Sequence, residues 1–255
     1  MRMAQTIDEV IARLEAIIRD CVVRNDRMGY FPALYNRVTR AVRDAIQQGQ
    51  FQDGLRMERL DAVFANRYLT AYDEYRNGQR PTASWQQAFE TTKNDRHIIL
   101  QDLLIGMNAH IDLDLGIAAA EVCPGNAIDG LKNDFDKINQ ILFQQIPTVT
   151  QQIGNVSPEF QELVNVLPFH GEVLAGLSIT VLRDFAWKLA KSLAPANAFE
   201  RKLLIGARDL EVDALGVPIL VDWPIIQMIK REESTDVARN IRVLAAGEFV
   251  YTVKA

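Results

Sequence analysis

Residues 95–122 read DRHIILQDLLIGMNAHIDLDLGIAAAEV, and the rest of the expected fold is arranged around this segment. Apolar residues occupy nearly every side of its helical projection, and the sequence that follows, Cys123-Pro124-Gly125, stops a helix. A helix that is apolar nearly all round is stable only when other elements cover it. The pattern therefore predicts a central helix over about 95–122 inside a larger helical assembly.

On both sides of this segment, apolar residues recur every three or four positions, which is the period of an amphipathic helix. Thr6 and Glu9 form a capping-box pattern at the first helix, and Pro147 is expected to end another. The expected helices cover about 7–24, 32–49, 55–76, 127–145, 170–193, 198–215 and 235–246, with short helices after Ser84 and Ser157 and an exposed connector at 147–157. The chain is predicted to be all-α, a single-domain helical bundle of about nine or ten helices over residues 1–255.

Composition narrows the classes of protein. With 255 residues, 48% of them hydrophobic, the chain can bury one large core. A net charge of -5 argues against a nucleic-acid surface, which needs clustered Lys and Arg. Two distant cysteines, Cys21 and Cys123, make neither a CxxC motif nor a disulfide framework. The N-terminus lacks a continuous apolar region, and the apolar runs fall short of the roughly 20 residues that span a bilayer. We therefore expect a soluble, cytoplasmic protein without a membrane span.

The central segment contains an H-x-x-x-D pair, His110 and Asp114. Residues four apart on a helix lie on one face about one turn apart, a spacing that suits two metal ligands or a base with its orienting acid. Gly106 projects near the same face and is expected to leave room beside the imidazole. Other helices must supply further ligands, and His170, which has Glu172 close by, is the expected third one. In this metal-assisted form of the hypothesis, the cofactor is a divalent metal ion.

Asp61 is a further candidate because it shares its helix face with Phe64 and Tyr68. A carboxyl group on an apolar face is hydrogen-bonded, ion-paired or functional. The functional interpretation makes Asp61 a catalytic residue. The structural interpretation is a core salt bridge with Arg67 or Arg183, and an analogous pair of Arg183 with Asp184 is expected to be structural.

Several stretches resemble a bacterial domain-of-unknown-function family with the signature NAHI-x-x-DL. They are YFPALYNRVTRAV (30–42), LDAVFANRYLTAYDEY (60–75), LLIGMNAHIDLDLGIAAA (103–120), NDFDKIN (133–139) and RDFAWKLA (183–190). They span most of the chain from Tyr30 to Ala190, and the NAHIDLDL segment is the most specific of them. The resemblance implies a family but no established activity.

Two functions remain open. One is a small-molecule or metal-assisted enzyme, for example a hydrolase, with its pocket at His110 and Asp114 and with Asp61 as a further catalytic group. The other is a non-catalytic ligand-binding or scaffold protein in which these residues form a structural polar core. The chain contains no GxGxxG, GxxxxGK[ST], GxSxG or HExxH motif that would favour a particular enzyme class. A small molecule is the expected partner, whereas nucleic acid and membrane are not, and the oligomeric state stays open.

Overall fold

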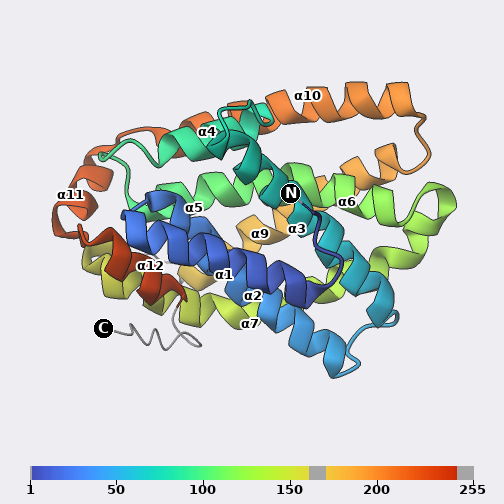
Figure 1. The fold of residues 1–255 in the computed structure, drawn as a ribbon, viewed down its shortest axis with the longest axis horizontal. Helices are drawn as coiled ribbons and strands as arrows, with labels where there is room; N and C mark the ends of the chain where they lie inside the picture. The colour runs from blue at the N-terminus through green and yellow to red at the C-terminus, as the bar shows by residue number, and fades with distance from the viewer. Residues whose placement is uncertain (1, 161–170, 246–255) are drawn as a thin grey trace.

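The computed structural model describes residues 2–160 and 171–245, without the side chains of residues 171–178. Within these ranges every regular element is a helix, so the all-α prediction is confirmed. In Figure 1 the helices are stacked around α5 and α6, with α10 along one side and α1, α2 and α7 along the other.

The described part of the chain contains eleven α-helices and four other helical segments. The α-helices are α1 (Ile7–Arg24), α2 (Tyr30–Gln47), α3 (Gly54–Arg76), α4 (Ala83–Thr91), α5 (Ile99–Met107), α6 (Leu115–Val122), α7 (Lys132–Val156), α9 (Gly171–Leu193), α10 (Ala198–Gly216), α11 (Pro224–Glu232) and α12 (Val237–Ala245). The other segments are η1 (Arg27–Gly29), η2 (Asn108–Asp114), η3 (Gly125–Leu131) and η4 (Val217–Leu220). Most of the other expected limits are met within a few residues, but α11 was not expected. The short helix expected after Ser157 lies mostly outside the described residues.

The central helix consists of α5, η2 and α6, which form one helical segment from Ile99 to Val122. It begins four residues later than expected, and its middle part, η2, is π-helical. Helices α2, α3, α4, α9 and α10 all pack against it. By length and composition this segment could cross a membrane, but 83% of its most apolar window is buried inside the protein, as in the core helix of a bundle. Among the described residues, α10 and η4 together with α11 also meet that criterion, as a pair bent by 72°.

Three buried aspartates connect the central helix to three other elements. The ion pairs are Asp102 with Arg27 in η1, Asp112 with Arg208 in α10, and Asp114 with Arg67 in α3. Because a buried carboxylate without a partner is costly, each pair restricts which element can lie beside that part of the helix.

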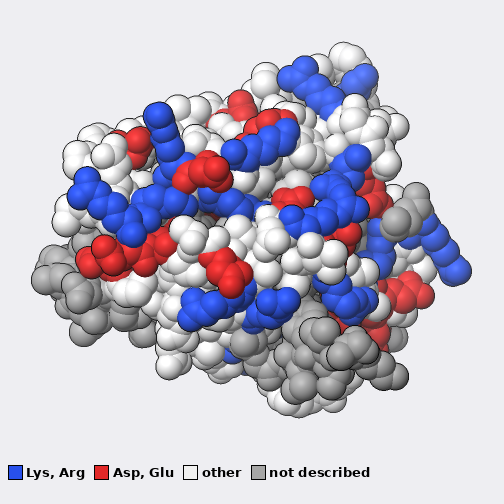
Figure 2. Space-filling view, turned by 60° about the vertical axis from the view of Figure 1, so that its left-hand side comes forward, with Lys and Arg blue, Asp and Glu red and all other residues white. Residues whose placement is uncertain are grey.

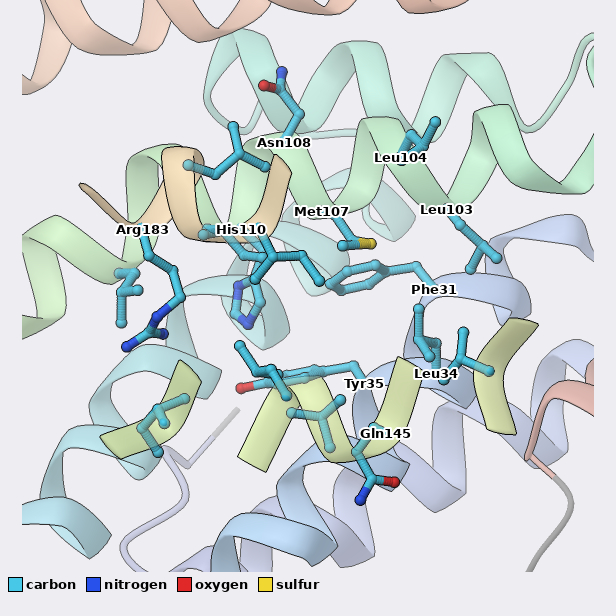
Figure 3. A pocket seen from close by; sticks show the side chains of 18 of the residues that line it. Phe31, Leu34, Tyr35, Leu103, Leu104, Met107, Asn108, His110, Gln145 and Arg183 are labelled. Carbon is cyan, nitrogen blue, oxygen red and sulfur yellow. The ribbon is translucent and has the colours of Figure 1, made fainter. Parts of the chain in front are cut away.

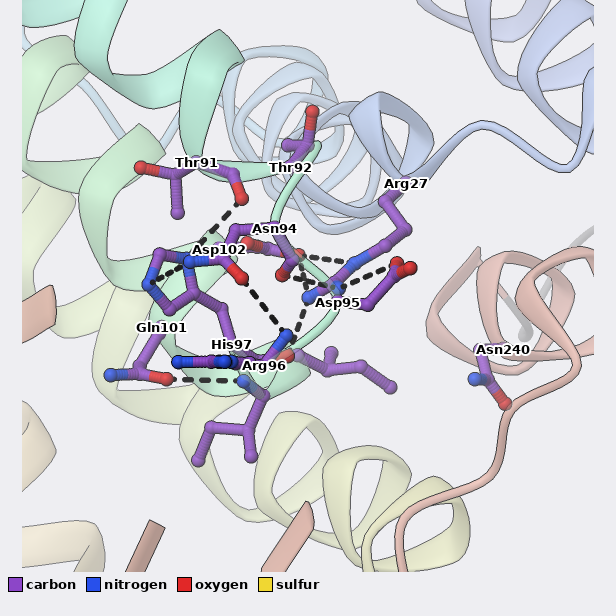
Figure 4. Close-up of polar contacts among 12 residues, drawn as sticks. Arg27, Thr91, Thr92, Asn94, Asp95, Arg96, His97, Gln101, Asp102 and Asn240 are labelled. Atoms are coloured by element: carbon purple, nitrogen blue, oxygen red, sulfur yellow. Dashed lines mark hydrogen bonds and ion pairs between the residues drawn. The ribbon is translucent and has the colours of Figure 1, made fainter. Parts of the chain in front are cut away.

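The Arg27 pair also holds the turn that precedes the central helix (Figure 4). Arg27 Nε lies 2.9 Å from Asp102 Oδ2, and the guanidinium also donates to the carbonyl oxygens of Asn94 and His97 at 3.0 and 2.7 Å. One arginine therefore joins η1, the turn and α5.

The prediction that residues 147–157 form an exposed connector is wrong. Helix α7 continues through Pro147 to Val156, and Ile153 and Val156 on this stretch are buried. A proline inside a helix removes one backbone hydrogen bond and crowds the preceding turn. Here the apolar face at positions 146, 149, 153 and 156 packs in the core near α2 and α12, and this burial outweighs the local cost.

Helix α12 packs against α1 and α2, so the last described helix lies on the first two. On the face shown in Figure 2, basic and acidic side chains are interleaved.

Candidate functional site

A cavity of about 720 Å³ lies between the central helix and α7, and residues of α2, α3 and α9 complete its wall. Most of the lining side chains are aliphatic or aromatic. Cavities of roughly 300–1,000 Å³ with apolar walls and a few polar groups are typical of small-molecule sites. The volume and the lining therefore match a ligand of drug or lipid size.

His110 projects into this cavity from η2 (Figure 3). Its ring stacks on Phe64 with centroids 3.7 Å apart and planes 9° apart, and the edge of Tyr35 lies at 4.4 Å. The π-helical segment coincides with the residues NAHIDLD. Because π-helical turns are rare and frequently found at functional sites, the backbone conformation makes this segment a candidate functional site, in addition to its sequence.

His110 and Asp114 lie on one side of the helix, as the spacing indicated. Nδ1 of His110 is 3.6 Å from Asp114 Oδ2, slightly beyond hydrogen-bond length. Asp114 accepts hydrogen bonds from Arg67 Nε and Trp85 Nε1, both at 2.7 Å. Burial opposes ionisation of Asp114, but Arg67, His110 and Trp85 together hold its pKa below the ordinary value. Asp114 is therefore an ionised carboxylate behind the imidazole, and it is not among the residues that line the cavity.

His110 differs from the other buried polar residues of the central helix because neither of its ring nitrogens has a hydrogen-bond partner among the described residues. Gln101 donates to Ile219 O and Asn108 donates to Val212 O, and the aspartates have their arginines. Burial lowers the pKa of His110 below its ordinary value although Asp114 acts in the opposite direction. At neutral pH the imidazole is therefore uncharged and free to exchange a hydrogen bond with a ligand.

Asp61 lines the same cavity as His110, from α3. The prediction that Asp61 forms a salt bridge with Arg67 or Arg183 is wrong. Arg67 is paired with Asp114, and Arg183 has no carboxylate within ion-pair distance among the described residues. Burial, helped by the neighbouring Glu58, raises the pKa of Asp61 from 3.8 to about 8. Asp61 is thus a protonated carboxyl group at neutral pH and can donate a hydrogen bond.

Five of the sixteen unpaired buried polar atoms among the described side chains lie in this wall. They are Tyr35 Oη, Asp61 Oδ2, both ring nitrogens of His110 and Arg183 Nε. Protein interiors satisfy nearly all buried polar groups, so several unpaired ones around one cavity require an explanation. A ligand that hydrogen-bonds to them is the simplest explanation.

Gly106 makes room on this face, as expected, but the room is filled by Phe31. A Cβ atom at Gly106 would lie 2.6 Å from Phe31 Cδ2. Phe31 in turn contacts the edge of His110, with centroids 5.5 Å apart. The glycine therefore lets Phe31 of α2 support the imidazole.

The expected metal set is not assembled among the described residues, where no group of three or more His, Cys, Asp and Glu side chains could hold a metal ion. Both oxygens of Asp114 already accept hydrogen bonds. His170 lies outside the described residues, so the combination of His110, Asp114 and His170 stays a prediction.

Sequence reasoning missed Tyr35 and Arg183 as parts of the cavity wall. The expected structural pair of Arg183 with Asp184 is absent from the described ion pairs, and the Arg183 side chain instead extends toward the cavity (Figure 3). One signal was present, because Arg183 follows the apolar run ITVL at 179–182. An arginine that adjoins an apolar run is a candidate for burial. The residue that it would pair with cannot be inferred from sequence spacing.

Fold and site together define an all-α bundle protein with a buried, mainly apolar cavity of ligand size. The chain belongs to a family of unknown function (DUF5995), whose profile matches residues 7–221. This range includes every cavity residue described above. No curated protein and no solved structure matches the chain.

Proposed function

We propose that this protein binds a largely apolar small molecule in the cavity between the central helix and α7. The observation that carries the proposal is the apolar cavity of about 720 Å³, whose wall presents the unpaired His110. An apolar ligand gains free energy from its burial in such a space, at roughly 25 cal/mol per Å² of apolar surface. The few polar groups would orient it.

A neutral apolar dye, Nile red, tests this proposal without involving charge. Its fluorescence should rise saturably with the wild-type protein. Met107→Trp should weaken this binding strongly, because Met107 points into the cavity and a larger side chain there fills the space (Figure 3).

Met228→Trp is the matched control, since Met228 lies in α11 with 55% of its surface exposed and does not line the cavity. It should bind the dye as the wild type does, and thermal midpoints of both variants report on folding. Absence of saturable binding to the wild type, or equal affinities of a folded Met107→Trp variant and the control, contradicts the proposal.

A second candidate function is hydrolysis of a bound ester or amide, with His110 as general base. The pair of His110 and Asp114 favours it, because Asp114 beside Nδ1 can orient the ring while Nε2 has no hydrogen-bond partner in the described part of the chain. The protonated carboxyl group of Asp61 would donate a hydrogen bond to a substrate oxygen. A metal-assisted form is not part of the proposal, since Asp114 has both oxygens engaged. Loss of the reaction in His110→Phe tests this candidate.

A further inference from the structure

Arg183 in α9 is a buried cation in the cavity wall. Only 4% of its surface is exposed. Its guanidinium donates one hydrogen bond, to the carbonyl oxygen of Phe135, and lies 4.3 Å from the centroid of the Phe135 ring. Its Nε atom is buried without an acceptor. Five N–H donors with one acceptor leave most of the hydrogen-bonding capacity of this group unused within the described protein.

The other buried arginine in the described ranges shows what is missing. Arg27 is 8% exposed and has the carboxylate of Asp102 at 2.7 Å together with two carbonyl acceptors. A buried charge is ordinarily paired in this way, because removing it from water is costly. Arg183 therefore lacks, within residues 2–160 and 179–245, the counter-charge that Arg27 has.

Among the described residues, no neighbouring acid supplies that counter-charge. Asp136 is about half exposed and paired with Lys132, and Asp184 is exposed. Both favour the charged form of Arg183, but burial is the larger effect and lowers its pKa to about 10. The guanidinium is thus charged at neutral pH, whereas Asp61 and His110 in the same wall are neutral. The part of the cavity wall that the structure describes therefore carries one uncompensated positive charge.

The cavity is also polarised along its length (Figure 3). Arg183 and His110 lie toward one end, and Leu34 and Leu103 lie toward the other. A ligand that fits both ends has an anionic group at one end and an apolar chain at the other.

We propose that the cavity binds a single-chain amphiphile whose anionic head group, a carboxylate or a phosphate ester, pairs with Arg183. This inference rests on the proposed function, because it names the class of ligand for the same cavity. The planar guanidinium fork matches both head groups and is the preferred side chain for them. The apolar chain would lie between α2, α7 and the central helix.

Three ligands with the same chain test it: dodecanoate, dodecyl phosphate and dodecanol, each measured by displacement of Nile red below its micelle-forming concentration. The wild type should bind at least one anionic ligand about tenfold or more tightly than dodecanol, as expected for a charge-assisted hydrogen bond. Arg183→Gln should lose this preference and keep its affinity for dodecanol. Acetate and inorganic phosphate should displace no dye, because they lack the chain.

Arg80→Gln is the matched control, since it removes the same charge from an exposed arginine that does not line the cavity. It should retain the wild-type preference. If dodecanol and the dye bind but neither anion is preferred, or if folded Arg183→Gln retains the preference, the amphiphile inference is wrong and the proposed function stands. If dodecanol and the dye also fail to bind, the proposed function itself is wrong. Arg183→Lys keeps the charge, and partial retention of the preference in that variant supports direct pairing if Arg183→Gln does not fold.

Discussion

At the scale of single residues, His110 combines a well-packed ring with unsatisfied hydrogen-bonding atoms. Its ring stacks on Phe64, so the shape of the side chain stabilises the surrounding core. Its nitrogens have no hydrogen-bond partner among the described residues, so their burial costs free energy that no hydrogen bond to those residues returns. Residues that lower the stability of the fold in this way are frequent at functional sites.

His110→Phe separates these two contributions. The ring contact with Phe64 is kept and the unpaired nitrogens are removed, so the free energy of unfolding should stay constant or rise by up to about 1 kcal/mol. His110→Ala, which removes the ring and leaves a void, should instead lower it by about 2–3 kcal/mol. Chemical denaturation measures both, and a similar large loss in the two variants would show that the nitrogens are structural.

The same variant decides on the second candidate function. If His110 is a general base, the wild type should hydrolyse an apolar ester such as p-nitrophenyl dodecanoate, and His110→Phe should not. Because the pKa of His110 is lowered, the wild-type rate should be constant around neutral pH and fall only at acid pH, where the imidazole becomes protonated and cannot accept a proton. An undiminished rate in the variant would exclude this role.

At the scale of elements, the central helix depends on close approach by its neighbours. Gly116 in α6 faces the backbone of α9, where a Cβ atom would lie 2.6 Å from the carbonyl oxygen of Ala186. A backbone atom cannot move aside as the end of a flexible side chain can. The distance between α6 and α9 is therefore set by a missing side chain.

Gly116→Ala should lower the free energy of unfolding by about 2 kcal/mol, because the clash exceeds the gain in helix propensity. Gly206→Ala in α10 is the control, since nothing lies within 4 Å of its Cβ position. That exchange should raise the free energy of unfolding by about 0.5–1 kcal/mol. Equal effects of the two substitutions in denaturant unfolding would contradict the assigned contact.

At the scale of the whole molecule, the three aspartate–arginine pairs of the central helix fix which elements surround it. Each joins residues distant in the sequence, and each aspartate is buried. In Figure 1, α10 and α3 accordingly lie beside the central helix, although α3 precedes it in the sequence and α10 follows it after α7 and α9. Breaking one pair leaves a buried carboxylate without its counter-charge.

Arg67→Met should therefore lower the free energy of unfolding by about 3 kcal/mol, because Asp114 is only 1% exposed and keeps its Trp85 hydrogen bond alone. Arg24→Met breaks a pair of the same length class, 2.9 Å, whose partners are 53% and 41% exposed. The control should change the free energy of unfolding by about 0.5 kcal/mol or less. A comparable loss in both variants, measured by denaturant unfolding, would show that burial of the ion pair does not determine its contribution to the free energy of unfolding.

Local signals along the chain were sufficient for much of this description. Capping residues and apolar periodicity predicted the all-α class and most helix limits, because these depend on interactions within a few residues. The same reasoning predicted that His110 and Asp114 share a face and that a long apolar helix lies at the centre. These features depend on interactions between residues close together in the sequence, so sequence patterns predict them directly.

Other features depend on contacts between distant segments. Helix α7 passes through Pro147 because the apolar face beyond it is buried in the core, an energy that no local rule contains. Asp61 and Arg183 could have formed a salt bridge by composition. Packing instead leaves both in the wall of one cavity, with Asp61 protonated and Arg183 without a carboxylate partner among the described residues. The position of a charge relative to its partners is set by the way helices pack. The cavity, with a guanidinium in its wall, therefore forms only when all the helices are assembled.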